Sequence, residues 1–240
     1  MNILSWNILA QEFIKTHYYP MIPARLLNQK RRQKQIMRVL QRLNPDIMLL
    51  QEVMENDYLL LLHLFRDTHY VLRGTNIKWQ NKESQSANVI LCNKTLFSLP
   101  ELILFDFGVG AKCGYRRGQR GQRGRRGNLL ILNIHLDDAS LVKRQQQLKT
   151  LRPLLQEHEA VIVGGDFNDS HSFHLLNLKV LNRQATYYIE SAMCIDNILT
   201  KGLAFKPAIV LNAFGTDVVK QFKTYGSDHL PVFTESEGFT

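Results

Sequence analysis

The sequence predicts an α/β fold, and two observations carry that prediction. The chain has 240 residues, of which 45% are hydrophobic, so it can bury a full core. Short apolar runs alternate along it with amphipathic helical segments. Because no stretch rich in proline and serine divides the chain, we expect one domain over residues 1–240, with an insertion at about 114–127.

Seven short apolar runs are predicted to be strands, because continuous apolar character fits strands that other layers cover. They cover residues 3–6, 47–50, 87–92, 129–134, 160–163, 195–199 and 232–234. Three segments with helical spacing of apolar residues are predicted to be helices, namely 33–43, 58–65 and 140–156. Pro45 should stop the first helix, since the residue before a proline is biased away from helical geometry.

The positive charge is concentrated in two segments. The chain has 30 lysines and arginines against 21 aspartates and glutamates, a net charge of +9. Residues 25–42 hold seven basic side chains and residues 116–127 (RRGQRGQRGRRG) hold six, and neither segment holds an acid. A mildly acidic body with two basic segments predicts contact with a polyanion. The alternative is a solvated helix face and an accidental low-complexity loop.

Both basic segments are candidate contacts for RNA or DNA. On the first predicted helix, one face away from the apolar stripe carries Arg31, Lys34, Arg38 and Arg42. Residues 116–127 contain no apolar side chain, so we expect a flexible insertion between two strands that follows a nucleic-acid backbone.

Cysteine usage and the N-terminus predict the compartment. Three scattered cysteines without a CxxC motif favour a reducing environment. Strand-like residues follow Met1 directly, so no signal peptide is expected. No apolar run approaches the ~18 residues of a membrane span. We therefore expect an intracellular protein of the cytoplasm or nucleus without a membrane span, and a monomer.

Polar side chains stand at the edges of the predicted strands, where α/β proteins build active sites. They are Asn7, Gln51, Glu52, His135, Asp166, Asn168, Asp196, Asp228 and His229. Aspartate, glutamate and asparagine oxygens are the ligands that Mg²⁺ and Mn²⁺ prefer, and histidines transfer protons or contact anions near neutral pH. This set suits metal-dependent hydrolysis of a phosphate ester. The sequence has no P-loop and no GxSxG motif, and HxxH at His171 and His174 lacks a second ligand cluster.

Six motifs in this order resemble the endonuclease/exonuclease/phosphatase superfamily. They are SWNIL at 5–9, LQEV at 50–53, NIHL at 133–136, GDFN at 165–168, IDNI at 195–198 and SDH at 227–229. The N-terminal third is more similar to the deadenylase, nocturnin and 2′-phosphodiesterase branch, through SWNILAQ, Tyr19-Pro20 and the NPDI segment at 44–47. The resemblance implies a four-layer α/β/β/α sandwich of two packed mixed sheets, with the site at one end.

The resemblance also implies roles. Glu52 would be the principal ligand of a Mg²⁺ ion (Mn²⁺ as a substitute), with Asn7 beside it and Asp228 in support. Asp166 would be a metal ligand that orients or deprotonates the attacking water, and Asn168 would hold the phosphate or a second metal. His229, oriented by Asp196, would contact the scissile phosphate as part of the metal site, and His135 would be a second phosphate contact or proton donor.

Two positions depart from the family pattern, because Asn197 replaces a usual tyrosine and Asp169 a usual serine or threonine. The expected function is a metal-dependent phosphodiesterase of nucleic acid, either an RNA 3′-exonuclease of the deadenylase kind or a DNA endonuclease. The first alternative is a phosphoesterase for phosphoinositide, sphingomyelin or tyrosyl–DNA links. The second is an inactive, basic nucleic-acid-binding module.

Overall fold

Two mixed sheets of six strands each form the centre of the molecule. The computed structural model describes residues 1–79, 82–116 and 126–237. In order across the first sheet, the strands are β11 (Ile209–Val210), β12 (Val232–Glu235), β1 (Asn2–Asn7), β2 (Ile47–Met54), β4 (Lys82–Asn93) and β3 (His69–Trp79). Across the second they are β5 (Glu101–Phe105), β6 (Gly108–Arg116), β7 (Arg126–His135), β8 (Ala160–Asp166), β10 (Asp196–Lys201) and β9 (Lys179–Val180).

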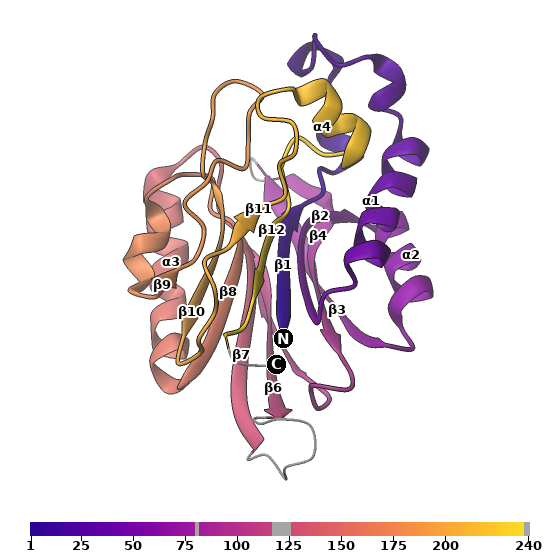
Figure 1. Cartoon of the computed structure of the whole chain (residues 1–240). Coiled ribbons are helices and arrows are strands. Elements are labelled where there is room, and N and C mark those ends of the chain that lie inside the picture. Colours follow the sequence, from indigo (N-terminus) through magenta and orange to yellow (C-terminus); the bar gives the residue numbers. More distant parts are fainter. Residues whose placement is uncertain (80–81, 117–125, 238–240) are drawn as a thin grey trace.

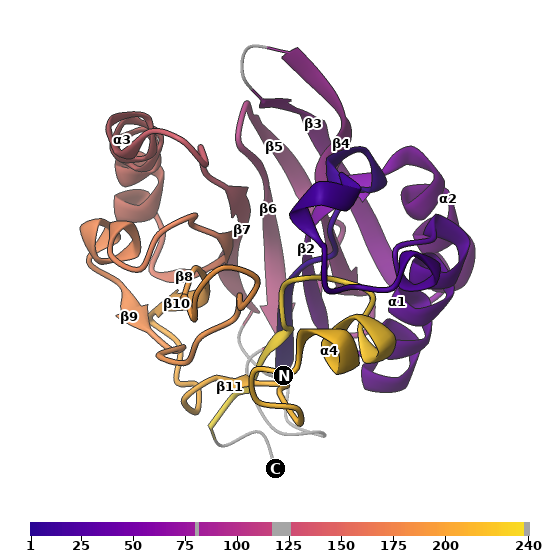
Figure 2. The ribbon, with the colours of Figure 1, turned by 90° about the horizontal axis from the view of Figure 1, so that it is seen from above.

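Helices cover the outer faces of the two sheets. The helices of the described residues are α1 (Gln29–Leu43), α2 (Glu55–Phe65), α3 (Leu141–Glu157) and α4 (Val218–Thr224), with short 3₁₀ helices η1 (Gln11–Phe13), η2 (Thr16–Tyr18), η3 (Ala24–Leu26) and η4 (Ser172–Leu176). α4 lies at the top of the molecule in Figure 1 and not against the outer face of a sheet. α1 and α2 lie against the first sheet, and α3 lies against the second (Figures 1 and 2). This arrangement confirms the four-layer α/β/β/α sandwich. Among the described residues, no helix has the length and apolar character needed to cross a membrane.

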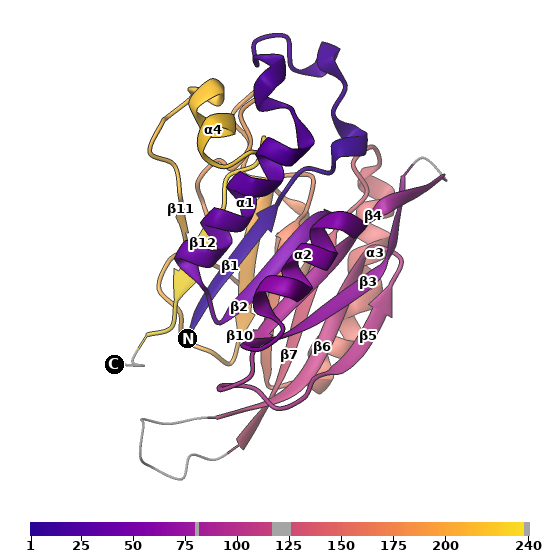
Figure 3. The same ribbon diagram turned by 90° about the vertical axis from the view of Figure 1, so that its right-hand side faces the viewer.

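Alternating side chains along each strand fill three separate layers of core. Ile3 of β1 belongs to the core between the two sheets, whereas its neighbour Leu4 packs in the layer under α1 and α2. On β7, Ile131 faces the first sheet and Leu132 packs in the layer under α3. Figure 3 shows α1 and α2 in front of the first sheet. Burial on both faces explains why the central strands have near-continuous apolar sequences.

The predicted elements are present, with shifts at their ends. α1 begins at Gln29, four residues before the predicted start, because the side chain of Asn28 accepts a hydrogen bond from Arg31 N and caps the helix. α3 begins one residue late, since Ser140 is its cap, and β10 begins at Asp196. Strands β3, β5, β6, β9 and β11 and helix α4 were not predicted.

The position of the predicted site in the fold follows from two parallel strand pairs. β1 pairs in parallel with β2, and β7 pairs in parallel with β8. The carboxyl ends of all four strands point to the same end of the molecule, at the top of Figure 1. Arg116 and Arg126, which belong to the basic segment 116–127, pair at the opposite end of β6 and β7 from His135. Residues 117–125 lie outside the described residues, so contact of nucleic acid with this segment stays a prediction.

Candidate active site

A pocket of about 410 Å³ opens at the carboxyl ends of the two parallel strand pairs. Six of the predicted site residues line it, namely Glu52, His135, Asp166, Asn168, Asp228 and His229. The remaining two, Asn7 and Asp196, are buried and hydrogen-bonded to members of that set. The structure therefore brings all eight together, from both sheets and from the loop before β12.

Asn7 joins the carboxylates of the two sheets. Its Nδ2 donates to Glu52 Oε1 at 2.8 Å and to Asp166 Oδ2 at 3.0 Å. Its Oδ1 accepts a hydrogen bond from Leu9 N at 2.9 Å, which fixes the turn after β1. Asn7 thus holds two acidic groups at a fixed separation while its side chain is fully buried.

A β-bulge aims Glu52 into the pocket. The register of β2 with β4 shifts between Leu50 and Val53, and Glu52 takes the left-handed conformation with φ of +58°. Such a backbone is disfavoured for a non-glycine residue and is typical of functional sites. Ala10 N donates to Glu52 Oε2 at 2.8 Å. Burial raises the pKa of this carboxyl. A negative charge on Glu52 therefore destabilises the folded protein unless a nearby cation compensates it.

His229 and Asp196 form a buried ion pair beside Asp166. His229 Nδ1 lies 2.9 Å from Asp196 Oδ2, and its Nε2 lies 3.8 Å from Asp166 Oδ2. Burial opposes the imidazolium charge, yet the carboxylates of Asp196 and Asp166 hold the pKa of His229 well above its ordinary value. His135 approaches the same Asp166 oxygen, with its Nε2 at 3.7 Å. Asp166 therefore lies between two imidazoles.

The loop after β8 depends on a close approach of two strands. A Cβ on Gly165, which has φ of +149°, would lie 1.9 Å from Ile134 O, so only glycine fits there. Asn168 has φ of +53°, and its Nδ2 donates to Leu136 O at 2.8 Å. The Asn168 backbone N donates to Asp166 Oδ1 at 2.9 Å. These contacts explain why glycine precedes Asp166 and why an asparagine follows it two residues later.

Asp228 is held by a residue whose role the sequence analysis did not assign. Tyr19 donates its hydroxyl to Asp228 Oδ2 at 2.9 Å, while Asp228 Oδ1 has no partner. Burial, and to a smaller extent the Asp228 carboxylate, raise the pKa of Tyr19. The phenol therefore stays protonated and donates its hydrogen bond to Asp228. A further aromatic side chain, Tyr187, lies with its ring centroid 5.2 Å from that of His229. An aromatic residue therefore packs on His229 although Asn197 replaces the tyrosine of the family motif.

Two buried arginines tie down the loops of the site, and neither was assigned this role from the sequence. Arg32 of α1 donates to Gly226 O at 2.6 Å and to Ile8 O at 2.8 Å, and also to Leu9 O. It thereby links the turn after Asn7 to the loop that carries Asp228. Helical spacing alone does not separate Arg32 from its exposed neighbour Arg31. The carbonyl groups that bind Arg32 lie on loops far away in the sequence, so their positions would have to be known first.

Arg144 of α3, the helix that covers the second sheet, fixes two other loops of the site in the same way. Its Nε donates to Asp169 Oδ2 at 2.7 Å and its Nη1 to Asp137 O at 2.8 Å. This pair joins the loop after His135 to the loop after Asp166. It also accounts for Asp169, one of the two departures from the family pattern. The other, Asn197, is buried and exchanges hydrogen bonds of 3.0 Å with the Asn182 backbone.

The donor set fits a divalent cation. Ligand atoms of Asp166, Asp196 and His229 all lie within 4.8 Å of one another. Asp196 Oδ1 and Asp228 Oδ1 are buried without a hydrogen-bond partner, which is costly for a carboxylate that nothing neutralises. Glu52 connects to the same group through Asn7. Hard oxygen donors in this number suit Mg²⁺ or Mn²⁺ better than a thiolate-preferring metal.

Comparison with protein families identifies the chain. The model of the Endonuclease/Exonuclease/phosphatase family matches residues 4–229. The protein belongs to the endonuclease/exonuclease/phosphatase family. Its site residues lie in the matched region, on both sheets of the fold that this family shares with the solved structures described next.

Solved structures of similar fold have low sequence identity to this family member. ANGEL2, a 2′,3′-cyclic phosphatase, has a TM-score of 0.74 at 15% identity, covering 97% of this chain and 93% of that one. The human nocturnin catalytic domain gives 0.65 at 18% identity, covering 98% and 92%. D. rerio TDP2 in complex with a single-stranded DNA product gives 0.64 at 16% identity, covering 98% and 97%. No curated protein matches by sequence.

Proposed function

We propose that this family member is a divalent-metal-dependent phosphodiesterase that hydrolyses nucleic acid. The observation that carries the proposal is the convergence of Glu52, Asp166, Asp228 and His229 in one pocket, with Asp196 buried behind His229. One carboxylate oxygen of Asp196 and one of Asp228 are buried without a hydrogen-bond partner. Membership of the family supports hydrolysis of phosphate esters.

We assign each side chain of the site a distinct role in hydrolysis. Mg²⁺ or Mn²⁺, held by Glu52, Asp166 and Asp228 with Asn7, Asn168 and His229 around them, would neutralise charge that builds on phosphorus. Asp166 accepts the proton of the attacking water, whose oxygen bonds to phosphorus as the ester P–O bond breaks. Asp196 Oδ2 accepts a hydrogen bond from His229 Nδ1–H, which orients the imidazole so that its Nε2–H is the donor available to the phosphate. His135 supplies a second contact or a proton for the leaving oxygen.

The exposed face of α1 supports a nucleic-acid substrate. Arg31, Lys34, Arg38 and Arg42 are all exposed, as predicted, and α1 begins at the end of the molecule where the pocket opens (Figure 1). A cationic surface on this helix attracts a phosphate backbone. Because the family includes both endonucleases and exonucleases, RNA 3′-exonuclease and DNA endonuclease activities are both candidate forms of the proposed function.

A panel of substrates tests the proposal. Labelled poly(A), mixed RNA, single-stranded DNA and an abasic duplex are incubated with Mg²⁺, with Mn²⁺ and with a chelator, and the products are mapped. We expect metal-dependent cleavage of at least one polymer. Binding of the polymers without turnover under either metal would support the inactive binding module instead and would overturn the proposal.

A further inference from the structure

The strand that carries Glu52 loses its regular pairing just before it reaches the pocket. β2 and β4 pair regularly up to Leu50 and Val89, and the register has shifted where their pairing resumes. Gln51 and Glu52 lie in this interval, opposite Asn88 of β4. Because an extra residue in one strand bends that strand and changes the direction of its side chains, the direction of the Glu52 carboxylate depends on what fixes this bulge.

One side chain of the second sheet reaches across to the bulge. Asn133 of β7 is fully buried, and its Nδ2 donates to Leu50 O at 2.8 Å and to Val89 O at 2.9 Å. These two carbonyl groups belong to the last regular pair before the bulge, one on each strand. Asn133 therefore clamps β2 to β4 at the point where the bulge begins.

The neighbouring amide of Gln51 orients the side chain of Asn133. Gln51 Nε2 donates to Asn133 Oδ1 at 2.6 Å and to Leu49 O at 2.9 Å. Since an amide oxygen accepts and an amide nitrogen donates, this contact sets which end of Asn133 faces the two carbonyl groups. From the other side, Ile8 N donates to Gln51 O at 3.1 Å. The bulge is thus held from β7 and from the turn after β1.

These amides lie in a layer that is otherwise apolar. Toward the opposite end of β7, Ile131 and Leu129 lie on the same face as Asn133 and belong to the hydrophobic core between the sheets. Gln51 Oε1 and Asn88 Oδ1 are buried without a hydrogen-bond partner among the described residues. Such atoms cost stability, so apolar side chains would fill this space more favourably. A role in geometry accounts for amides at this level.

The clamp joins the strands that end in two residues of the site. Glu52 follows Leu50 on β2, and His135 follows Asn133 on β7. The backbone of Glu52, with φ of +58°, has a conformation that persists only where its surroundings fix it. We infer that Asn133 is a positioning residue: by clamping β2 to β4, it holds the Glu52 carboxylate in the direction that binding of a divalent cation requires. The inference rests on the proposed function, to which that cation belongs.

The affinity for Mn²⁺ in the absence of substrate tests this inference. Asn133→Leu keeps the approximate size of the side chain and removes its donor and its acceptor. The dissociation constant is obtained from the electron paramagnetic resonance signal of free Mn²⁺ during titration with protein. Because residues that orient metal ligands typically change metal affinity by about 10–100-fold, we expect binding to weaken at least 10-fold. An unchanged dissociation constant in folded Asn133→Leu would overturn the inference.

Leu129→Ala is the matched control for a loss of stability. Leu129 is buried on the same face of β7 as Asn133, toward the opposite end of the strand. Truncation of a buried leucine lowers the temperature of unfolding, so this variant is destabilised without a change at the bulge. We expect its Mn²⁺ affinity to stay within about 2-fold of the wild-type value. Equal weakening in Leu129→Ala and Asn133→Leu would assign the effect to stability alone and overturn the inference.

A double-mutant cycle shows whether Asn133 acts through Glu52. In a Glu52→Gln protein the carboxylate is already absent, so adding Asn133→Leu should weaken Mn²⁺ binding by less than about 2-fold further. The same loss with and without Glu52 would mean that the clamp affects the metal by another route, which contradicts the inference. Thermal unfolding of all variants identifies those that are folded.

Gln51→Met keeps the test decisive if Asn133→Leu does not fold. It leaves Asn133 in place and removes the contact that orients it, so we expect Mn²⁺ binding to weaken at least 3-fold. Wild-type affinity in folded Gln51→Met would then overturn the inference.

Hydrolysis of bis(4-nitrophenyl) phosphate, a small phosphodiester, separates the inference from the proposed function. If the wild type binds Mn²⁺ but hydrolyses neither this ester nor nucleic acid, the proposed function is wrong, and the dissociation constants alone decide the inference. If hydrolysis requires metal and Asn133→Leu binds Mn²⁺ as the wild type does, the proposed function holds and the inference is wrong. A wild type that does not bind Mn²⁺ would overturn both.

Discussion

At the scale of single residues, Asp196 and His229 form a buried contact of 2.9 Å at the centre of the proposed chemistry. Asp196 is fully buried and burial raises its pKa, so its charge costs stability that only His229 and its neighbours offset. Asp196→Asn keeps the shape of the side chain and removes that charge. We expect kcat for metal-dependent hydrolysis to fall by about 10²–10⁴-fold, because His229 loses the partner that fixes its tautomer.

The stability of Asp196→Asn distinguishes a catalytic role from a structural one. Because Asp166 stays close to His229 and still offsets an imidazolium charge, the temperature of unfolding should stay within roughly 3 °C of the wild-type value. Activity and stability that fall together would show that Asp196 acts mainly in folding. Steady-state kinetics and thermal unfolding of the same preparations provide both measurements.

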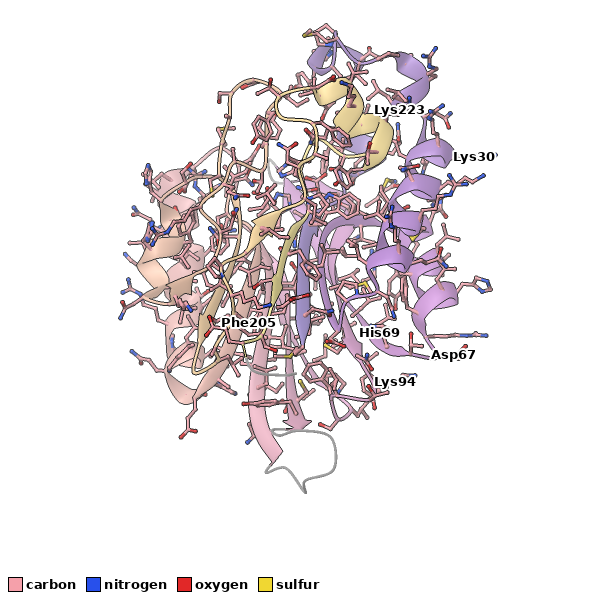
Figure 4. The ribbon with its side chains drawn as sticks, in the orientation of Figure 1. Lys30, Asp67, His69, Lys94, Phe205 and Lys223 are labelled. Carbon is pink, nitrogen blue, oxygen red and sulfur yellow. The ribbon has the colours of Figure 1, made fainter. Side chains whose placement is uncertain are left out.

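A second residue-scale prediction concerns pH and lies away from the site. His69 is buried, with Nε2 3.0 Å from Pro45 O, and burial lowers its pKa below the ordinary value of 6.5 (labelled in Figure 4). The unfolded chain therefore takes up a proton near pH 6.5 while the folded protein does not. The contribution of His69 to stability is present above that pH and is lost as pH falls toward its folded pKa.

His69→Gln isolates this contribution from the other histidines. The free energy of unfolding in urea is measured for both proteins at pH 7.5, 6.5 and 5.5. We expect the wild-type advantage over the variant to shrink as the pH is lowered. An advantage that grows at low pH would mean that the charged imidazole is favoured in the fold and would contradict the assignment.

The residues of the site differ in how far the sequence could predict them. Glu52, His135 and Asp166 end or follow buried strands, so their convergence followed from strand pattern and motif order. Tyr19 and Arg32 sit on a loop and a helix that reach the site only through tertiary contacts. Nothing local in the sequence distinguishes a buried arginine from its exposed neighbours, because its partners are backbone carbonyls of distant loops.

At the scale of elements, α3 fixes two loops of the site through Arg144. Burial opposes the charge of Asp169, yet hydrogen bonds from Ser172 and the His171 amide, together with Arg144, hold its pKa below the ordinary value. We expect Arg144→Met and Asp169→Asn to be coupled by about 1–2 kcal/mol in a double-mutant cycle of unfolding free energies. Lys149→Met, an exposed position of the same helix, should change stability by less than about 0.5 kcal/mol. Additive effects would contradict the pairing.

A further prediction concerns binding of nucleic acid by the outer face of α1. Replacing Arg31, Lys34, Arg38 and Arg42 by glutamine should weaken binding of single-stranded nucleic acid. It should also make the slope of log K against log salt shallower, by about 0.7 per lost phosphate contact. Hydrolysis of bis(4-nitrophenyl) phosphate should not change. Lys94→Gln, on the lower part of the molecule in Figure 4, is the control. An unchanged salt slope would show that this face is only solvated.

Two physical causes explain why strands such as β5 and β6 were not predicted. β5 is at the edge of its sheet and leaves Leu102 and Leu104 exposed, so its pattern lacks a buried face. β6 carries three glycines within its sequence GVGAKCGYR, and a Cβ on Gly108 would lie 2.5 Å from Asn133 O. Glycine required by close packing weakens the local strand signal. The other interior strands, buried on both faces, were predictable from their continuous apolar runs.

At the scale of the whole molecule, the site exists only where the two halves meet. Glu52 comes from the first sheet and Asp166 from the second, and buried amides join the sheets beneath them. Gln51 Nε2 donates to Asn133 Oδ1 at 2.6 Å, and Asn133 Nδ2 donates to Leu50 O at 2.8 Å. The four-layer architecture therefore holds the carboxylates close together, which makes a divalent cation the natural neutralising group.

The most direct test of this account is metal-dependent hydrolysis by the wild type and by Glu52→Gln. The rate on bis(4-nitrophenyl) phosphate and on the polymer that the substrate panel selects is measured in Mg²⁺, in Mn²⁺ and with a chelator. We predict hydrolysis that the chelator abolishes and added metal restores, and a loss of about 10²–10⁴-fold in the folded Glu52→Gln protein. Hydrolysis that survives the chelator, or a Glu52→Gln protein as active as the wild type, would contradict the account.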